Sequence, residues 1–297
     1  MELLLDTQTL GKEVERIASA LRSELGDDGH AVIGLSGGLD SDVVARLTVR
    51  AVGAERVKLF TVLQQGMEER HRQHAQDTAE ALGIPLRKID LGNMSHTFIT
   101  AMALADPTES FQPEGLLDPS RAKCSLRTVI LSTYQDRGYV VVGTSNRTEI
   151  ETGFFLPFGD GIWHFGPIAH LYKSQVILLA HSVGSRPEVI AQPPSAGFWP
   201  GQEDLEDLAY WLYNCGPIAC QRLFTDEDDA RVQKIRIQLS IESIDKTLFA
   251  LAQNLDDTRI SAVSGLPTEI VVRFRQLRER AQRSKGRALG SRLTPLQ

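Results

Sequence analysis

The apolar positions in the first half of the chain alternate between two periodicities. Residues 10–25 carry apolar side chains at the spacing of an amphipathic helix, which we expect to pack on a larger body. Four short apolar runs predict strands, at residues 31–35, 57–63, 86–89 and 139–142. Helical patterns separate them, at residues 41–52, 68–82 and 120–135. This alternation predicts a doubly wound α/β fold, a parallel sheet with helices on both faces, because parallel neighbours need crossover connections.

The second half of the chain is predicted to be largely helical around two long irregular stretches. After Asn146 the alternation ends, and residues 154–167 and 192–202 follow neither periodicity. Loops of that length are often functional. We expect one domain over residues 1–297, with a polar and basic tail from Ser284 that is partly disordered.

Composition and charge narrow the class of protein. The 297 residues are 42% hydrophobic, enough for a substantial core, and no run approaches the roughly 18 apolar residues of a membrane span. We therefore expect a cytoplasmic protein without a membrane partner. The net charge of -6 argues against a nucleic acid partner. The three cysteines form no CxxC pair, which favours buried or incidental thiols over metal or redox chemistry.

The first predicted strand runs into a turn that opens a predicted helix, Ser36-Gly37-Gly38-Leu39-Asp40-Ser41. Two glycines let the backbone approach an anion closely, the amides at the helix start point toward it, and the serine hydroxyls donate further hydrogen bonds. Asp40 would repel a polyphosphate unless a cation lay between them, so its presence indicates Mg²⁺. A Gly-Gly turn alone more often merely joins a strand to a helix, whereas the whole string is far more specific.

The SGGLDS string resembles the pyrophosphate loop of the N-type ATP pyrophosphatases, which have an adenine nucleotide alpha hydrolase-like fold and release AMP and pyrophosphate. That group includes NAD synthetases, GMP synthetases, asparagine synthetases and tRNA thiolases. Three further segments are similar to those of NAD synthetases: VVGTSNRTE at 141–149, GPIAHLYKSQ at 166–175 and PPSAGFWPGQ at 193–202. The last is the most discriminating, so the chain resembles a divergent ammonia-dependent NAD synthetase.

This resemblance implies roles for individual side chains. It places Glu149 opposite Asp40 as the second metal carboxylate and Lys173 at an ATP phosphate, with Asp40, Lys173 and Ser195 as the catalytic set. Helix capping by Glu149 and plain solvation of Lys173 are the alternatives. The implied ATP-binding residues are Ser36, Gly37, Gly38, Asp40, Ser41, Arg127, Thr144, Lys173 and Ser195, and the implied substrate-binding residues are Phe158, Asp160 and His164.

The implied reaction converts a carboxylate to an amide. The acid attacks the α-phosphate of ATP to form an acyl adenylate, and ammonia then displaces AMP. Charge neutralisation by Mg²⁺ and Lys173 suffices, without a protein nucleophile. In the NAD synthetase family the acid is deamido-NAD, and the enzymes are homodimers. We find no room for the amidase domain of glutamine-dependent relatives, which predicts free ammonia or a separate glutaminase partner as the nitrogen source.

The departures from the family pattern cluster where deamido-NAD would bind. Pro157 stands at an expected lysine, His164 at an aspartate and Ser125 at an arginine. A gapless alignment sets Arg283-Ser284 at a His-Lys pair, whereas a one-residue shift would bring Lys285 into that role. About thirty residues, 209–238, form an insertion whose aromatic content indicates that it folds. The insertion either covers the substrate entrance or pads the surface.

Three functions remain open after these comparisons of motifs. The first is an NAD synthetase acting on deamido-NAD, the second is the same chemistry on a different carboxylic acid, and the third is a noncatalytic nucleotide-binding homologue. Thiolation of tRNA ranks lowest, because the chain is acidic and lacks a CxxC sulfur carrier.

Overall fold

A computed structural model describes residues 6–63, 67–199, 201–283 and 289–294 of the chain. Its centre is a parallel sheet with the strand order β3-β2-β1-β4, formed by β1 (His30–Gly34), β2 (Val57–Leu63), β3 (Leu86–Asp90) and β4 (Tyr139–Val141). From β1 the chain winds to one edge through β2 and β3, and then returns to the other side of β1 as β4. The order therefore reverses between β1 and β4, and ligands of such sheets bind beyond the carboxyl ends of the strands at that point.

Helices cover both faces of this sheet, which confirms the predicted fold class. Side chains alternate between the faces along a strand. Ala31 and Ile33 of β1 therefore belong to the core under α1 (Thr7–Leu25) and α2 (Leu39–Val52), while Val32 belongs to the opposite core under α5 (Leu117–Gln135). Both sides of β1 are fully buried, as the continuous apolar run predicted.

A second, two-stranded sheet extends the first. β5 (Trp163–Gly166) pairs in parallel with β6 (Leu289–Arg292), and an isolated bridge from Val142 to Phe165 joins β5 to the end of β4. The expectation that residues 154–167 are irregular throughout was wrong, because a four-residue strand is too short to leave a readable periodicity. In the tail, expected to be partly disordered, residues 289–292 form β6, and residues 284–288 lie outside the described residues.

The rest of the chain is mostly helical. α4 (Met94–Ala105) escaped prediction because it exposes apolar side chains and lacks a clear polar face. Among the described residues, no helix is both long enough and apolar enough to cross a membrane. The other helices are α3 (Glu69–Ala81), α6 (Arg147–Thr152), α7 (Lys173–Ser182), α8 (Pro187–Ala191), α9 (Asp204–Tyr213), α10 (Asp226–Arg236), α11 (Ile241–Ala252), α12 (Asp257–Ser264) and α13 (Thr268–Arg283), with short 3-10 turns at Ala54–Arg56 and Pro107–Glu109.

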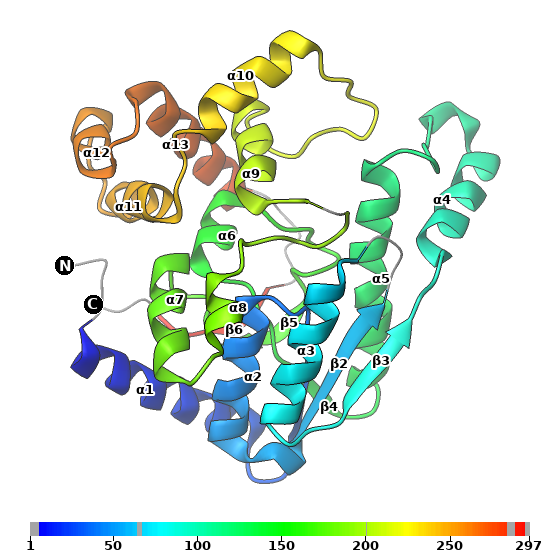
Figure 1. The fold of residues 1–297 in the computed structure, drawn as a ribbon, viewed down its shortest axis with the longest axis vertical. Helices are drawn as coiled ribbons and strands as arrows, with labels where there is room; N and C mark the ends of the chain where they lie inside the picture. The colour runs from blue at the N-terminus through cyan, green and yellow to red at the C-terminus, as the bar shows by residue number, and fades with distance from the viewer. Residues whose placement is uncertain (1–5, 64–66, 200, 284–288, 295–297) are drawn as a thin grey trace.

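Helices α9 to α13 lie beyond the carboxyl ends of the central strands and build a core of their own (Figure 1). The predicted insertion, residues 209–238, consists of the second half of α9, a loop, and α10. Val232 and Ile235 of α10 are buried in the same core as Leu212 of α9. The Tyr210 hydroxyl also donates to Asp229 Oδ1 at 2.8 Å. The insertion is therefore a folded part of the helical half.

A buried hydrogen bond between a carboxylate and an imidazole ties α1 to the segment that leads into α7. Glu13 and His170 are 1% and 3% exposed, and Glu13 Oε1 lies 2.6 Å from His170 Nε2. Arg16 donates to both carboxylate oxygens at 2.8 Å. Burial opposes ionisation of Glu13, but the hydrogen bonds from His170 and Arg16 outweigh it and hold its pKa below the usual value. Since His170 stands three residues before Lys173, this pair fixes the start of α7.

We expect Glu13→Ala to lower the free energy of unfolding by about 3 kcal/mol, because it leaves His170 buried without its partner. Urea denaturation measures the loss. Glu15→Ala is the matched control, since Glu15 lies on the same helix but its pair with Arg50 is more than half exposed, 56% for Arg50 and 58% for Glu15. We expect that control to leave the urea midpoint close to the wild-type value, because exposed pairs contribute little to stability. Equal losses in the two variants would contradict a buried anchor.

Candidate functional site

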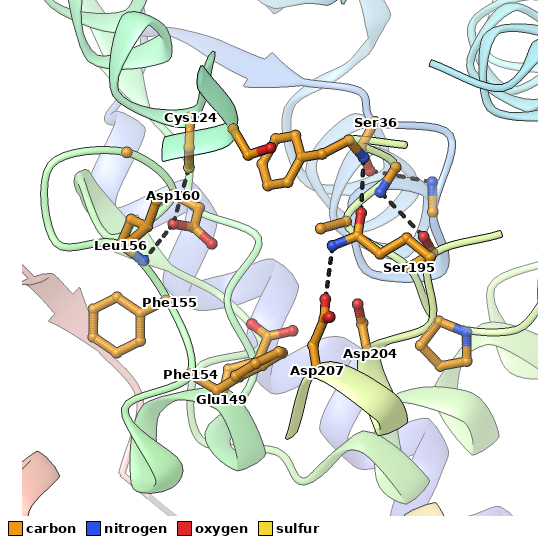
Figure 2. A pocket seen from close by; sticks show the side chains of 18 of the residues that line it. Ser36, Cys124, Glu149, Phe154, Phe155, Leu156, Asp160, Ser195, Asp204 and Asp207 are labelled. Atoms are coloured by element: carbon orange, nitrogen blue, oxygen red, sulfur yellow. Dashed lines mark hydrogen bonds between the residues drawn. The ribbon is translucent and has the colours of Figure 1, made fainter. Parts of the chain in front are cut away.

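A cavity of ≈ 840 Å³ opens beyond the carboxyl ends of β1 and β4. Its wall combines the turn after β1, α5, residues 154–162, the loop at residues 192–202, the start of α9 and part of the insertion. Figure 2 shows part of this wall, with Ser36 and Ser195 on one side and Asp160 on the other. The cavity therefore lies at the point where the strand order reverses, as expected for this class of sheet.

The conformation of the turn at residues 36–41 is stabilised by hydrogen bonds from its two serines. Ser36 N donates to Ser41 Oγ at 3.2 Å, Gly38 N donates to Ser36 Oγ at 3.2 Å, and Ser41 Oγ donates to the Gly38 carbonyl at 3.0 Å. Gly37 has a φ of 81°, and a Cβ there would collide with the backbone carbonyl of His71, so only glycine fits. Gly38 begins α2 without a side-chain cap, which leaves amides at the helix start for an anion.

Two carboxylates face each other across Asn146. The Asn146 side-chain amide donates to Asp40 Oδ1 at 3.3 Å and to Glu149 Oε1 at 2.8 Å. Asn146 and Glu149 also form a capping box at the start of α6. The sequence offered helix capping and a position opposite Asp40 as alternatives for Glu149. The structure shows both at once. Burial, reinforced by the charge of Asp40, raises the pKa of Glu149 well above its usual value.

Lys173 is the cation of this cluster. Its Nζ pairs with Asp40 Oδ2, and the two side chains are only 12% and 18% exposed, so it is not the solvated lysine of the alternative interpretation. Burial acts to lower the pKa of Lys173, but the charges of Asp40 and Glu149 outweigh it and raise the pKa. The ammonium group is therefore charged at neutral pH.

Polar side chains of α6 and α11 position Lys173. Its backbone amide donates to Thr148 Oγ1 at 3.0 Å, and Thr148 Oγ1 donates to Asp245 Oδ1 at 2.6 Å. The other carboxylate oxygen of Asp245 accepts from Ser174 N at 2.7 Å. Asp245 is fully buried in α11. The helical half of the protein therefore orients Lys173, which pairs with Asp40 of the sheet half.

The donor set suits Mg²⁺. Mg²⁺ prefers oxygen ligands and usually takes one or two carboxylates together with water and substrate phosphates. Asp40 and Glu149 supply two such carboxylates beside the phosphate-binding turn. In the described part of the chain no group of three or more Asp, Glu, His or Cys side chains could hold a metal ion. Phosphate oxygens and water would therefore complete the coordination shell.

Two further acids of the cavity were missed as site residues by sequence reasoning. Asp204 and Asp207 lie in the first turn of α9 and point into the same part of the cavity as Glu149 (Figure 2). Burial, with the neighbouring charges of Asp207 and Asp40, raises the pKa of Asp204 to about 7. Burial likewise raises the pKa of Asp207 to about 6, although Gln202 donates to it at 2.7 Å. The only signal in the sequence was an acidic run directly after the PPSAGFWPGQ segment.

The other predicted site residues divide into two groups. Arg127, Thr144, Ser195 and Asp160 all line the cavity. Within the described chain, however, the structure does not bring the two remaining substrate-binding candidates to its wall. The Phe158 side chain is 66% exposed on the surface, and Nδ1 of His164 accepts from Val141 N at 2.9 Å, which commits that ring to the junction of β4 and β5.

Part of the insertion also belongs to the cavity wall, including Ile218, Cys220 and Leu223. Arg121 of α5 holds this loop in place, since its guanidinium donates to the Ile218 carbonyl and, at 3.0 Å, to Cys220 Sγ. Gln221 Nε2 donates to the Glu109 carbonyl at 3.0 Å on the other side. These contacts support the interpretation of the insertion as a cover of the cavity rather than as surface padding.

We expect Asp204→Asn to raise the Tm of the metal-free protein at pH 8. In the folded state the pKa of about 7 exceeds the unfolded value of about 4, so ionisation of Asp204 opposes folding above pH 7 and costs nothing below the unfolded pKa. The gain in Tm should be at least about 2 °C at pH 8 and should shrink toward pH 5. Differential scanning calorimetry in a chelator measures it, with Asp226→Asn in the exposed first turn of α10 as the control. A gain that is the same at both pH values would refute this account.

Comparison with known proteins identifies the family. The family model described as NAD synthase matches residues 13–247. An NH(3)-dependent NAD(+) synthetase from Methanococcoides burtonii is 33% identical over 226 residues, which cover 76% of this chain and 83% of that relative. Two solved structures share the fold. An NMN synthetase from Francisella tularensis superposes with a TM-score of 0.68 at 23% identity, over 96% of this chain and 98% of that one. An NH3-dependent NAD synthetase from Campylobacter jejuni gives 0.65 at 20% identity, over 94% and 96%. Because the family model spans most of the chain, and a relative above 30% identity spans three quarters of it, this protein belongs to the NAD synthase family.

Proposed function

We propose that this protein is an ammonia-dependent NAD synthetase, a ligase that uses ATP to convert the carboxylate of deamido-NAD to an amide and releases AMP and pyrophosphate. The observation that carries this proposal is the cluster of Asp40, Glu149 and Lys173 beside the phosphate-binding turn. Relatives at about a third identity that bear the name NH(3)-dependent NAD(+) synthetase support it. A noncatalytic homologue would have no need for a partly buried, mutually repelling carboxylate pair, so we rank that function below both catalytic ones.

The geometry assigns a task to each group in the first half-reaction. The amides at the start of α2 and the Ser36 and Ser41 hydroxyls would hold the phosphates of ATP. Asp40 and Glu149 would hold Mg²⁺, which when bound offsets negative charge on the phosphates. As an oxygen of the acid attacks the α-phosphorus, the bond to pyrophosphate breaks, and the ammonium group of Lys173 is placed to stabilise the departing charge.

The second half-reaction needs little from the protein beyond exclusion of water. Ammonia attacks the acyl carbon of the adenylate, the bond to AMP breaks, and the nitrogen loses a proton. A walled cavity favours ammonia over water as the nucleophile by limiting access of bulk solvent. Arg127, whose guanidinium lies 5.4 Å from the centre of the Phe198 ring, and Ser195 are the further nucleotide contacts that we propose. Free ammonia is the proposed donor, with a separate glutaminase as the other source.

A second candidate function is the same chemistry on a different carboxylic acid. It is favoured by the cavity wall, because residues of the insertion line the cavity beside α5. The sequence departures at Ser125 and Pro157 also remove charges that the family pattern predicts. The fold itself is compatible with either product, since one solved structure with this fold is named an NMN synthetase.

A substrate panel decides between these functions. We expect ATP, Mg²⁺, ammonium and deamido-NAD to yield NAD, AMP and pyrophosphate in equal amounts, followed by chromatography and a pyrophosphate assay. Nicotinate mononucleotide, aspartate and glutamate are the competing acids, and glutamine replaces ammonium in one arm. Lys173→Met should lower kcat about 100-fold or more with any productive acid, because it removes charge stabilisation at the leaving group. Turnover with another acid but not with deamido-NAD would favour the second candidate, and ATP binding without turnover on any acid would favour the noncatalytic homologue.

We further propose that the protein is a cytoplasmic homodimer, with α4 in the interface. Met94, Phe98 and Met102 recur every four residues on one face of α4 and are 49%, 51% and 36% exposed. Leu116, just before α5, adds a fourth apolar side chain that is 56% exposed. Contiguous exposed apolar side chains commonly mark protein interfaces.

Sedimentation velocity tests this assembly. The wild type should sediment as a dimer, and Phe98→Glu should shift it toward the monomer because a charge in the contact would be buried without a partner. Val263→Glu is the control, since Val263 is 54% exposed on α12, away from α4. A wild type that is monomeric at all concentrations would contradict the proposal, and cell fractionation would check the location.

A further inference from the structure

A buried histidine lies behind the phosphate-binding turn and has no part in the chemistry proposed above. His71 is in the first turn of α3, is 2% exposed, and still contributes to the cavity wall. The sequence around His71 contains no recognised motif, so sequence analysis gave this residue no role. Its position in the structure indicates a role in binding.

His71 stands between the two loops that would hold the phosphates. Its backbone carbonyl occupies the space where a side chain at Gly37 would project, which is why the turn needs glycine there. Its ring lies against the other loop, with Cδ2 and Nε2 at 3.4 and 3.5 Å from the position of a Cβ on Gly197. Gly197 follows Ser195 by two residues, and Ser195 Oγ accepts from its amide at 3.1 Å. The imidazole therefore sits at the junction of both loops.

The hydrogen bonds of the ring define which nitrogen carries the proton. Nδ1 lies 3.1 Å from the amide nitrogen of Gln192. With the Gln192 amide in this orientation, Nδ1 accepts and we assign the single proton of the neutral ring to Nε2. Burial, and then the charge of Arg70, lowers the pKa of His71, which keeps the ring neutral. Nε2 is buried and has no hydrogen-bond partner among the described residues. A buried donor without an acceptor destabilises a protein, so such a group usually meets its acceptor in a bound ligand or ordered water.

We propose that Nε2–H of His71 donates to a phosphate oxygen of ATP, and to the same oxygen of pyrophosphate after the reaction. An oxyanion is the acceptor that fits, because the two loops that His71 touches at Gly37 and Gly197 carry the α2 amides and the Ser195 hydroxyl that we propose as phosphate ligands. His71 thus binds the nucleotide through Nε2 and supports the loop at residues 192–202 through Nδ1. This inference rests on the proposed function only in taking ATP as the co-substrate.

Two amide substitutions separate the nitrogens of the ring. In His71→Gln the side-chain amide reaches the place of Nε2 and restores a donor to the ligand, whereas in His71→Asn it reaches only the place of Nδ1 and retains the contact with Gln192. We expect His71→Asn and His71→Ala to weaken binding of magnesium pyrophosphate and magnesium ATP about ten-fold, the loss of one hydrogen bond to a charged group. His71→Gln should bind within about three-fold of the wild type, and His74→Ala, one turn further along α3, should bind like the wild type.

Isothermal titration calorimetry without any acid substrate makes these measurements, so the result does not depend on which acid the enzyme amidates. Failure of every acid in the substrate panel would refute the proposed function and leave the binding result untouched. If His71 acts only by holding the loop, His71→Asn will bind like the wild type and Gln192→Ala as weakly as His71→Ala. That pattern would overturn the proposal. So would a His71→Gln variant that unfolds at the wild-type temperature but binds as weakly as His71→Asn.

Discussion

The ion pair between Asp40 and Lys173 is the contact on which the rest of the site depends. Asp40 reaches it from α2, which the phosphate-binding turn opens, and Lys173 from the first residue of α7. The lysine is held in turn by Thr148 and by Asp245 of the helical half. One buried pair therefore joins the nucleotide-binding sheet to the helices beyond it. Its position at the reversal of the strand order is what lets segments so far apart in sequence converge.

Around Lys173 the cavity holds more acidic than basic side chains. Asp40, Glu149, Asp204 and Asp207 gather around the ammonium group of Lys173. Burial, reinforced by neighbouring carboxylates, raises the pKa values of Glu149, Asp204 and Asp207. Such a cluster lowers folding stability. Clusters of this kind with raised pKa values occur mainly at functional sites, where a bound ligand offsets the repulsion. A divalent cation bound by Asp40 and Glu149 would neutralise the excess and draw a polyphosphate to the amides of the turn. Repulsion among these carboxylates and the proposed affinity for magnesium-bound nucleotide would thus be two consequences of one arrangement.

Local features of this molecule could be predicted from sequence, and features made by distant contacts could not. The strand at residues 57–63 and the turn at 36–41 carry their own signals, an apolar run and a glycine-serine string. β5 depends on partners far along the chain, and α4 exposes apolar side chains that blur its periodicity. The tasks of Asp204 and His71 were hidden for the same reason, because burial in a shared cavity is not a property of either segment. The spacing of the motifs located the insertion in the sequence, but its place at the cavity depends on the distant hydrogen bonds from Arg121 to Ile218 and Cys220.

The two sides of the cavity are supported by different elements. Asp40 on α2 and Lys173 on α7 are held by their ion pair and by the hydrogen bonds of Asn146 and Thr148. The opposite half rests on α5. Thr128 Oγ1 donates to the Phe158 carbonyl at 2.7 Å and Cys124 Sγ to Asp160 at 3.4 Å, which anchors residues 154–161, and Arg121 anchors the insertion. The segment that contains Pro157 and the insertion, two departures from the family pattern, are therefore both attached to α5. Under the proposed function, a change in the wall at α5 leaves Asp40 on α2 and Lys173 on α7 in place, so the acid substrate can differ while the proposed ATP chemistry stays the same.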